Sequence, residues 1–334
     1  MKACFFANAP FDLIERVEFY QNDIRILKDL GFDVKVANKI RNIPWGCDIY
    51  FAWWASSGTK ALLISKLLRK PCIIVAGGSD VSLKDTSPAG YNQRNFLQKI
   101  IIKWTLKHAH AVMAVSKDVY EDAVSLGAKR IHLVYNCIDT EKYKPMKTKR
   151  EDIVLAISHL SKQNVERKGI TDIINSVPLV LKKHPGTKFV IVGKKLDGYE
   201  ELYDLVRNLN IEKSVEFAGF ISEKEKIALY SRAKVFVSPS EHEGFGVAIA
   251  ESMACELPVV VTNKGAIAEV VGNAGLYVKF HDVKEIANAI NKLLANEEFR
   301  KSMGSKSRER IEMFSYEKRK EKIKKMVVQP GNQL

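Results

Sequence analysis

The strongest constraint on the fold is a regular alternation of short apolar runs with longer helical patterns. Each run is a few residues long, rich in Val, Ile and Ala, and bounded by turn residues, as is typical of strands buried on both faces. The first series of runs lies at Lys2–Ala7, Val34–Asn38, Asp48–Ala52, Cys72–Ala76, Ala111–Val115 and Ile131–Val134. Helical patterns separate these runs at Val17–Leu30, Thr59–Leu68, Asn92–Lys107 and Lys117–Ser125. This order predicts a parallel, doubly wound α/β sheet.

A second series of the same kind follows the polar segment Asp139–Glu151, whose composition and Pro145 predict an interdomain linker. Its expected strands are Ile153–Ile157, Lys188–Val192, Val215–Phe217, Val235–Val237, Pro258–Val261 and Gly275–Val278, and its closing helices are Val283–Ala295, Glu297–Met303 and Ser315–Met326. We therefore expect two Rossmann-like domains that face each other across a cleft. The predicted boundaries are residues 1–147 and 148–310, with a C-terminal helix and tail at 311–334 that could pack back on the first domain.

Composition supports two domains in an ordinary globular protein. The 334 residues are 46% hydrophobic, enough for two cores, and no apolar run reaches the roughly 18 to 20 residues of a membrane span. Asp12 and Glu15 come too early for a signal peptide, so we expect a cytoplasmic location. The five cysteines and seven histidines show no ligand spacing or disulfide framework, so no metal site is expected.

Positive charge is concentrated in the first half of the chain. The formal net charge is +14, and residues 1–150 hold 24 Lys and Arg against 14 Asp and Glu. Acidic lipid headgroups, a phosphorylated acceptor or nucleic acid could bind such a surface, and a solvated Lys-rich face explains the surplus equally well. Trp53 and Trp54 also have two possible roles. They could bind a sugar or a lipid interface, or they could pack in the core at a strand end.

The stretch from Val237 to Val260 combines a strand end, a glycine-containing turn and a helix-forming run. Gly244 and Gly246 lack the Cβ atoms that would hold a ligand away from the backbone N–H groups at the helix start. A helix start carries the positive end of the helix dipole and attracts phosphate. The stretch therefore favours an anion site, although a tight turn before a helix also explains the glycines.

The longer string PSEHEGFGVAIAESMACELPVVVTNKGAIAEVVGNAGLYV closely resembles the donor-binding segment of family 4 glycosyltransferases, which are retaining enzymes with an E-x7-E pattern. VYNCIDTEKYKP resembles the interdomain segment of that family, and ERKGI resembles its phosphate-binding segment. The resemblance is strong over residues 110–280 and weak before residue 70. It implies an α/β fold of the GT-B type, with two Rossmann-like parallel-sheet domains, and a hexosyl- or glycosyltransferase activity.

The resemblance also implies roles for individual residues. Lys168 would contact the donor diphosphate and Glu243 would hold hydroxyls of the transferred sugar, which makes both catalytic. Glu251 would grip the ribose diol, because an ionised carboxylate can accept hydrogen bonds from two vicinal hydroxyls. The other donor-binding residues implied in this way are Arg167, His159, Gly193, Phe220, Gly244, Phe245, Gly246 and Val247.

Two positions near the expected reaction centre depart from the family pattern. His159 stands where the family often has an arginine, and Arg167 beside Lys168 could compensate. Gly77 stands where many members have a histidine. Asp80 is the nearest polar candidate, so we expect it to be a catalytic group on the acceptor side.

Taken together, the sequence predicts a retaining, metal-independent glycosyltransferase without a separate cofactor. The donor would be a nucleoside-diphosphate sugar, with UDP or GDP as the favoured nucleotide. The acceptor would be a hydroxyl of a glycan, in a lipid-linked or polysaccharide form, and the basic half could associate with an acidic membrane surface on the inner face. A noncatalytic nucleotide-sugar-binding protein remains an alternative. A nucleic-acid-binding protein that uses the basic half is a weaker one, because no nucleic-acid-binding motif is present.

Overall fold

The computed structural model describes residues 1–84 and 90–327, which fold into two compact units. The first unit combines Met1–Cys137 with the C-terminal segment from Phe314, and the second is Ile138–Met313. The division falls between Cys137 and Ile138, whereas the composition of the linker predicted a boundary after residue 147. Within the described residues, no helix has the length and apolar character needed to cross a membrane.

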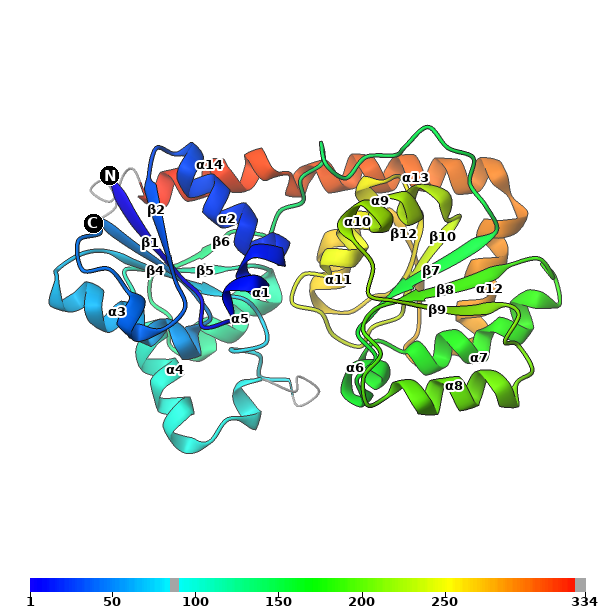
Figure 1. Ribbon diagram of the computed structural model, residues 1–334, viewed down its shortest axis with the longest axis horizontal. Helices are drawn as coiled ribbons and strands as arrows, with labels where there is room; N and C mark the ends of the chain where they lie inside the picture. Colours follow the sequence, from blue (N-terminus) through cyan, green and yellow to red (C-terminus); the bar gives the residue numbers. More distant parts are fainter. Residues whose placement is uncertain (85–89, 328–334) are drawn as a thin grey trace. The chain divides into compact units, whose positions relative to one another are not determined.

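The first unit is built on a six-stranded parallel sheet in the order β2-β1-β3-β4-β5-β6 (Figure 1). The strands are β1 (Lys2–Phe6), β2 (Asp33–Ala37), β3 (Ile49–Trp53), β4 (Cys72–Ala76), β5 (Ala111–Ala114) and β6 (Ile131–Leu133). All the pairings are parallel, and they occur where the apolar runs predicted strands. The helices are α1 (Phe11–Arg16), α2 (Glu18–Asp29), α3 (Ala55–Leu67), α4 (Phe96–His108), α5 (Lys117–Ser125) and α14 (Tyr316–Val327).

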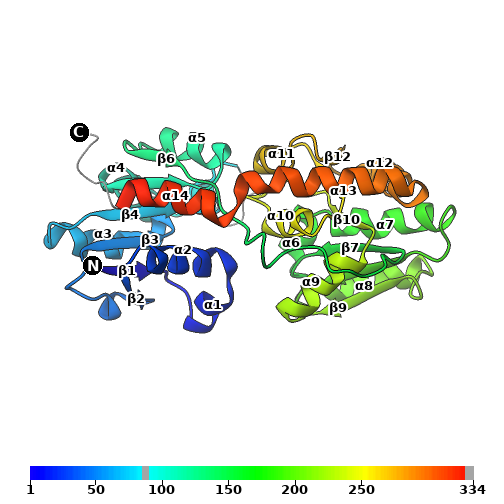
Figure 2. The same cartoon turned by 90° about the horizontal axis from the view of Figure 1, so that it is seen from above.

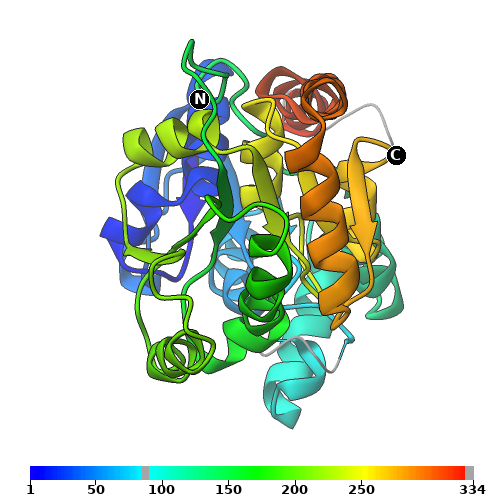
Figure 3. The same cartoon turned by 90° about the vertical axis from the view of Figure 1, so that its right-hand side faces the viewer.

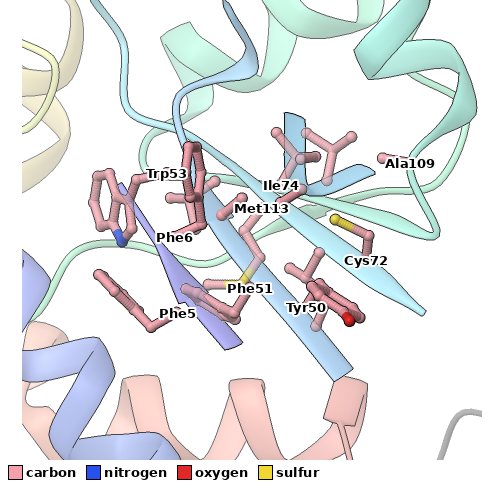
Figure 4. Close-up of a cluster of buried hydrophobic side chains, with 14 of the residues drawn as sticks. Phe5, Phe6, Tyr50, Phe51, Trp53, Cys72, Ile74, Ala109 and Met113 are labelled. Atoms are coloured by element: carbon pink, nitrogen blue, oxygen red, sulfur yellow. The ribbon is translucent and has the colours of Figure 1, made fainter. Parts of the chain in front are cut away.

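The core of the first unit is apolar on both faces of its sheet. Every residue of β3 and β4 is buried, which explains why these strands are continuous apolar runs rather than alternating ones. Figure 4 shows the aromatic side chains of β1 and β3 gathered with Met113 of β5. Trp53 belongs to this core with 1% exposure, and its indole N–H donates to Asp23. Core packing is therefore the alternative that the structure supports for Trp53.

Helix α14 lies beside α2 and is bound to the first unit through one buried ion pair (Figure 2). The guanidinium of Arg319 donates to both carboxylate oxygens of Asp23, at 2.6 and 2.8 Å, and both side chains are almost fully buried. Arg319 also donates to the carbonyls of Val134 and Tyr135. Every oxygen of the pair is thus matched by a donor, as a buried charge requires.

The second unit has a six-stranded parallel sheet in the order β12-β11-β10-β7-β8-β9. Its strands are β7 (Ile153–Ile157), β8 (Lys188–Val192), β9 (Val215–Gly219), β10 (Val235–Ser238), β11 (Val259–Thr262) and β12 (Gly275–Val278). Its helices are α6 (Lys162–Arg167), α7 (Ile170–Leu181), α8 (Tyr199–Asn208), α9 (Glu223–Arg232), α10 (Val247–Ala254), α11 (Gly265–Val271), α12 (Val283–Ala295) and α13 (Glu297–Ile311). Helix α12 packs beside α7, as the orange and green helices in Figure 3 show.

Helix α13 continues to Ile311, well past the predicted end at Met303. Gly304 follows the predicted end, and glycine is a poor residue for a helix interior. In the structure a Cβ at Gly304 would lie 2.4 Å from the carbonyl oxygen of Glu256, so the glycine lets α13 pack closely on that segment. Tertiary packing outweighs local propensity at this position.

The segment predicted to be a linker is attached to the second unit along much of its length. Tyr143 is 1% exposed, and Arg308 of α13 donates to the carbonyls of Thr140 and Tyr143. Arg150 donates to four carbonyls, those of Tyr230, Ala233, Cys255 and Glu256. The segment predicted to be an interdomain linker is therefore part of the second unit, because Arg150 binds the backbone of that unit and Arg308 of α13 binds the backbone of the segment.

Candidate functional site

Most of the candidate residues lie where the strands of the second unit end. Lys168 follows β7 and α6, Gly193 follows β8, Phe220 follows β9, and Glu243 follows β10. All of these strands are parallel, so their carboxyl ends meet at one edge of the sheet. Ligands of open α/β sheets bind at this edge.

Glu243 brings two cations together at the carboxyl edge. The Nζ atom of Lys168 lies 3.0 Å from one carboxylate oxygen, and a guanidinium nitrogen of Arg167 lies 3.5 Å from the other. Arg167 also donates to the carbonyl of His242 at 2.6 Å, and its own carbonyl accepts from the backbone N–H of Glu241. The turn after β10 is thus tied to the end of α6, which holds Lys168, Arg167 and Glu243 in one cluster.

The cluster is partly enclosed, with 14 to 18% of each side chain exposed. Burial pushes the pKa of Glu243 upward, but the charges of Lys168 and Arg167 outweigh this effect and lower that pKa to about 2. Glu243 is therefore a carboxylate across the physiological pH range. An anionic group that entered the cluster would meet two cations already oriented by this carboxylate.

The turn that carries Glu243 leads directly into α10. Gly246 precedes the helix with a φ of 85°, a left-handed conformation that favours glycine. Val247 is the first residue of α10 and is half-buried like Gly244, whereas Phe245 is buried at 3% exposure. Phe245 thus anchors the turn, while Gly244 and Val247 remain partly exposed.

Glu251 lies further along α10 and does not belong to the Lys168 cluster. It is 2% exposed, and Lys226 of α9 contacts both of its carboxylate oxygens at 3.0 and 2.9 Å. The hydroxyl of Tyr230 donates to the same carboxylate at 2.9 Å. Burial raises the pKa of Glu251, and Lys226 opposes that rise. Sequence reasoning missed Lys226 and Tyr230, although their spacing places both on one face of α9.

His159 and Gly193 lie side by side at the ends of β7 and β8. The backbone N–H of Lys194 donates to Nδ1 of His159, and burial together with the charges of Lys194 and Lys168 lowers the histidine pKa. His159 is therefore neutral at pH 7 and does not replace the charge of an arginine. Gly193 has a structural requirement of its own, because a Cβ there would lie 1.9 Å from the carbonyl oxygen of Ser158.

Phe220 presents an aromatic ring at the end of β9. The side chain is 62% exposed, and the Nζ atom of Lys194 lies 5.7 Å from the ring centroid. An exposed ring beside a cation can stack on a planar heterocycle. Phe220 was expected to bind the donor, and its exposed ring offers a side chain for that contact.

Asp80 belongs to the first unit and occupies a different environment. It is 2% exposed, and its carboxylate accepts a hydrogen bond from the backbone N–H of Ala55, the first residue of α3. Beside it, Gly77 lies under Trp54, whose ring carbon would be 2.3 Å from a Cβ at position 77. The ring of Trp54 therefore fills the space that a larger residue at position 77 would need. Asp80 is enclosed and holds the start of α3, so the geometry does not favour the catalytic role that we expected for it.

Replacing Asp80 with Asn is expected to stabilise the first unit at pH 7. Burial raises the pKa of Asp80 to about 6 from an ordinary value of 3.8, so its stabilising contribution is complete below pH 3.8 and is lost as the pH rises through 6. An asparagine side chain can still accept from the backbone N–H of Ala55, and it does not titrate. The stability that Asp80 loses between the two pH limits, and that asparagine keeps, is at most roughly 3 kcal/mol.

The measurement is urea unfolding at pH 4.5 and pH 7, followed by tryptophan fluorescence. All four tryptophans, Trp45, Trp53, Trp54 and Trp104, lie in the first unit and so report its unfolding. The advantage of Asp80→Asn should shrink at the lower pH. An equal effect at both pH values would contradict the assignment.

Potential metal ligands are dispersed in both units. Across residues 1–84 and 90–327, no group of three or more His, Cys, Asp or Glu side chains is arranged to hold a metal ion. All five cysteines are buried, and none is joined to another by a disulfide.

Two family models match the chain. The model described as glycosyl transferases group 1 matches residues 138–310, and the model described as Glycosyltransferase Family 4 matches residues 7–142. Among curated proteins, N-acetyl-alpha-D-glucosaminyl L-malate synthase of Bacillus anthracis is 26% identical over 89% of this chain and 79% of its own length. A capsular polysaccharide biosynthesis glycosyltransferase of Staphylococcus aureus, CapM, is 35% identical over 44% of this chain and 39% of its own length.

Solved structures agree on the fold. Anabaena HepE in complex with UDP and glucose has a TM-score of 0.77 and 18% identity, covering 98% of this chain and 100% of its own. Sucrose-phosphate synthase of Thermosynechococcus elongatus has a TM-score of 0.76 and 18% identity, covering 98% and 99%. These likenesses and the two parallel sheets confirm the predicted α/β fold of the GT-B type.

Proposed function

Because the chain belongs to the family of glycosyl transferases group 1, we propose that it transfers a sugar from a nucleoside diphosphate to a hydroxyl, with retention at the anomeric carbon. The glycosyltransferase activity follows from the family. The donor, the stereochemistry and the acceptor are our proposals, supported by the geometry of the second unit.

The convergence of Lys168 and Arg167 on Glu243 is the observation that carries the proposal. The donor diphosphate would lie against these cations and the start of α10, where backbone N–H groups and the helix dipole favour negative charge. Glu243, already ionised, would accept hydrogen bonds from hydroxyls of the transferred sugar. One cluster would thus hold both sides of the bond that breaks.

The nucleoside would occupy the part of the edge near Phe220 and Glu251. Glu251 would accept from the ribose hydroxyls, with Lys226 and Tyr230 holding its carboxylate in position. The exposed ring of Phe220 would stack on the base. A UDP sugar is the favoured donor, because the structure of the HepE neighbour contains UDP and glucose, and a GDP sugar is the second choice.

In the proposed reaction, the bond between the anomeric carbon and the diphosphate oxygen breaks while the acceptor oxygen bonds to the same face of the sugar. The departing diphosphate would take the proton of the acceptor hydroxyl. Negative charge grows on that diphosphate, and Lys168 and Arg167 would stabilise it more strongly in the transition state than in the bound donor. These fixed cations would serve in place of a metal ion. We propose a glycan hydroxyl, lipid-linked or on a polysaccharide, as the acceptor.

A thermal-shift panel of nucleotides tests the donor proposal. UDP or GDP at 100 times its Kd should stabilise the protein by about 2.7 kcal/mol, with a corresponding rise in Tm. Glu251→Gln should reduce that shift, because the amide accepts less strongly from the ribose diol than a carboxylate does.

Exposed Glu200→Gln, on α8 of the same unit, is the matched control and should keep the full shift. The panel should be followed by an assay for release of the nucleoside diphosphate from the best sugar donor. A protein that no nucleotide stabilises, or a Glu251→Gln variant with an unchanged shift, would contradict the proposed site.

A further inference from the structure

The first turns of α4 expose a row of large apolar side chains. Phe96 is 76% exposed, Leu97 69%, Ile100 48% and Ile101 40%. In Figure 1 this end of α4, in cyan, projects below the other helices of the first unit. Exposing several such residues together is unusual, because the transfer of each side chain out of water would lower the free energy.

The helix start is firmly defined by local hydrogen bonds. Asn95 accepts from the backbone N–H of Gln98 at 2.9 Å, and the side chain of Gln98 accepts from the backbone N–H of Asn95. This reciprocal capping box makes Phe96 the first helical residue. The apolar side chains are therefore displayed on a formed helix.

The exposed apolar face is distinct from the face that packs on the protein. The buried residues of α4 are Ile102, Thr105 and Leu106, and Thr105 meets Thr59 of α3 through their hydroxyls. At 3.6 residues per turn, the four exposed apolar residues cover an arc of about 140°, which lies beside the packed face and does not overlap it. The helix thus has one apolar face for the core and a second that the unit leaves uncovered.

Lysines follow one border of the uncovered face. Lys99, Lys103 and Lys107 recur four residues apart, so they form a row along the helix. Lys99 and Lys103 lie near the ring of Tyr91, with their Nζ atoms 5.6 and 5.8 Å from its centroid. Residues 90–117 contain five Lys and Arg and no Asp or Glu, so the charge of this segment has a single sign.

We propose that this face of α4, defined by Phe96, Leu97, Ile100 and Ile101 with the lysine row beside it, binds the surface of an anionic lipid bilayer. The apolar side chains enter the interface between headgroups and acyl chains, and the lysines extend to the phosphates. Charge complementarity selects this occupant, because a row of cations beside an apolar face matches the two layers of an anionic membrane. The inference is independent of the proposed donor site, which lies in the other unit.

Flotation of the full-length protein with lipid vesicles tests the proposal. The probes are vesicles of phosphatidylcholine alone and vesicles with 30% phosphatidylglycerol, on the order of the anionic content that creates a negative surface potential. The protein should float with the anionic vesicles, and Phe96→Gln/Leu97→Gln should weaken that partition by about tenfold or more. Lys103→Gln/Lys107→Gln should weaken it by severalfold and reduce its sensitivity to salt.

The matched control is Leu196→Gln/Tyr203→Gln, which removes two exposed apolar side chains from the second unit and should leave flotation unchanged. Circular dichroism of each variant and tryptophan fluorescence of the variants in the first unit monitor folding. Absence of flotation by the wild type, or equal flotation by Phe96→Gln/Leu97→Gln, would overturn the proposal. A dimer seen by analytical ultracentrifugation that this double variant dissociates would also overturn it, because the face would then bind a second copy of the chain.

Discussion

Replacing Lys168 with Ala is expected to slow glycosyl transfer by on the order of 100-fold, with a smaller effect on KM for the donor. The Nζ atom of Lys168 lies 3.0 Å from Glu243, in the cluster where, by our proposal, charge develops on the leaving diphosphate. Removing this cation takes away stabilisation that is greatest in the transition state, so kcat should fall further than donor affinity.

The measurement is steady-state release of the nucleoside diphosphate, with nucleotide binding determined separately by calorimetry. Lys183→Ala, which removes an exposed lysine beyond the end of α7, is the matched control and should be fully active. In Lys168→Ala the pKa of Glu243 should rise, because burial is then opposed mainly by Arg167. Normal turnover in the variant would remove Lys168 from the reaction.

Replacing Arg319 with Met is expected to destabilise the first unit by roughly 3 to 5 kcal/mol. The change leaves the carboxylate of Asp23 buried beside the indole N–H of Trp53 but without its guanidinium partner, and it removes the donor to two carbonyls of the segment after β6. Adding Asp23→Asn should recover part of the loss, because the second change removes the unpaired charge.

Urea unfolding monitored by tryptophan fluorescence measures this effect in the first unit alone. Lys318→Met on the exposed side of α14 provides the control and should change stability by less than about 0.5 kcal/mol. If Arg319→Met unfolds at the same urea concentration as the wild type, then α14 contributes little to the first unit.

The strands were the part of the fold that sequence could predict well. Strands such as β3 and β4 are buried on both faces, so their apolar character appears directly in the residues. The start of α3 was not predicted, because the helix begins at Ala55 through a hydrogen bond to Asp80, a residue distant in sequence. Local patterns do not contain such a partner.

The residues of the candidate site also differ in whether the sequence could identify them. Glu243, Lys168 and Arg167 could be selected because their motifs are local, and the structure brings these three together. Lys226 and Tyr230 could not be selected, because their function depends on packing α9 against Glu251. Asp80 was placed on the acceptor side because the sequence does not show that Trp54 fills the space beside Gly77.

The division of the chain has a consequence for biosynthesis. The first unit needs α14, yet the ribosome makes all of the second unit before it reaches Arg319. Domains generally fold as they emerge, N-terminal first. Here the nascent sheet of the first unit lacks the guanidinium of Arg319 beside Asp23 until the second unit has been translated. The unit that begins synthesis is therefore the last to be completed, and a ribosome that stalls before α14 releases a chain in which only the second unit is whole.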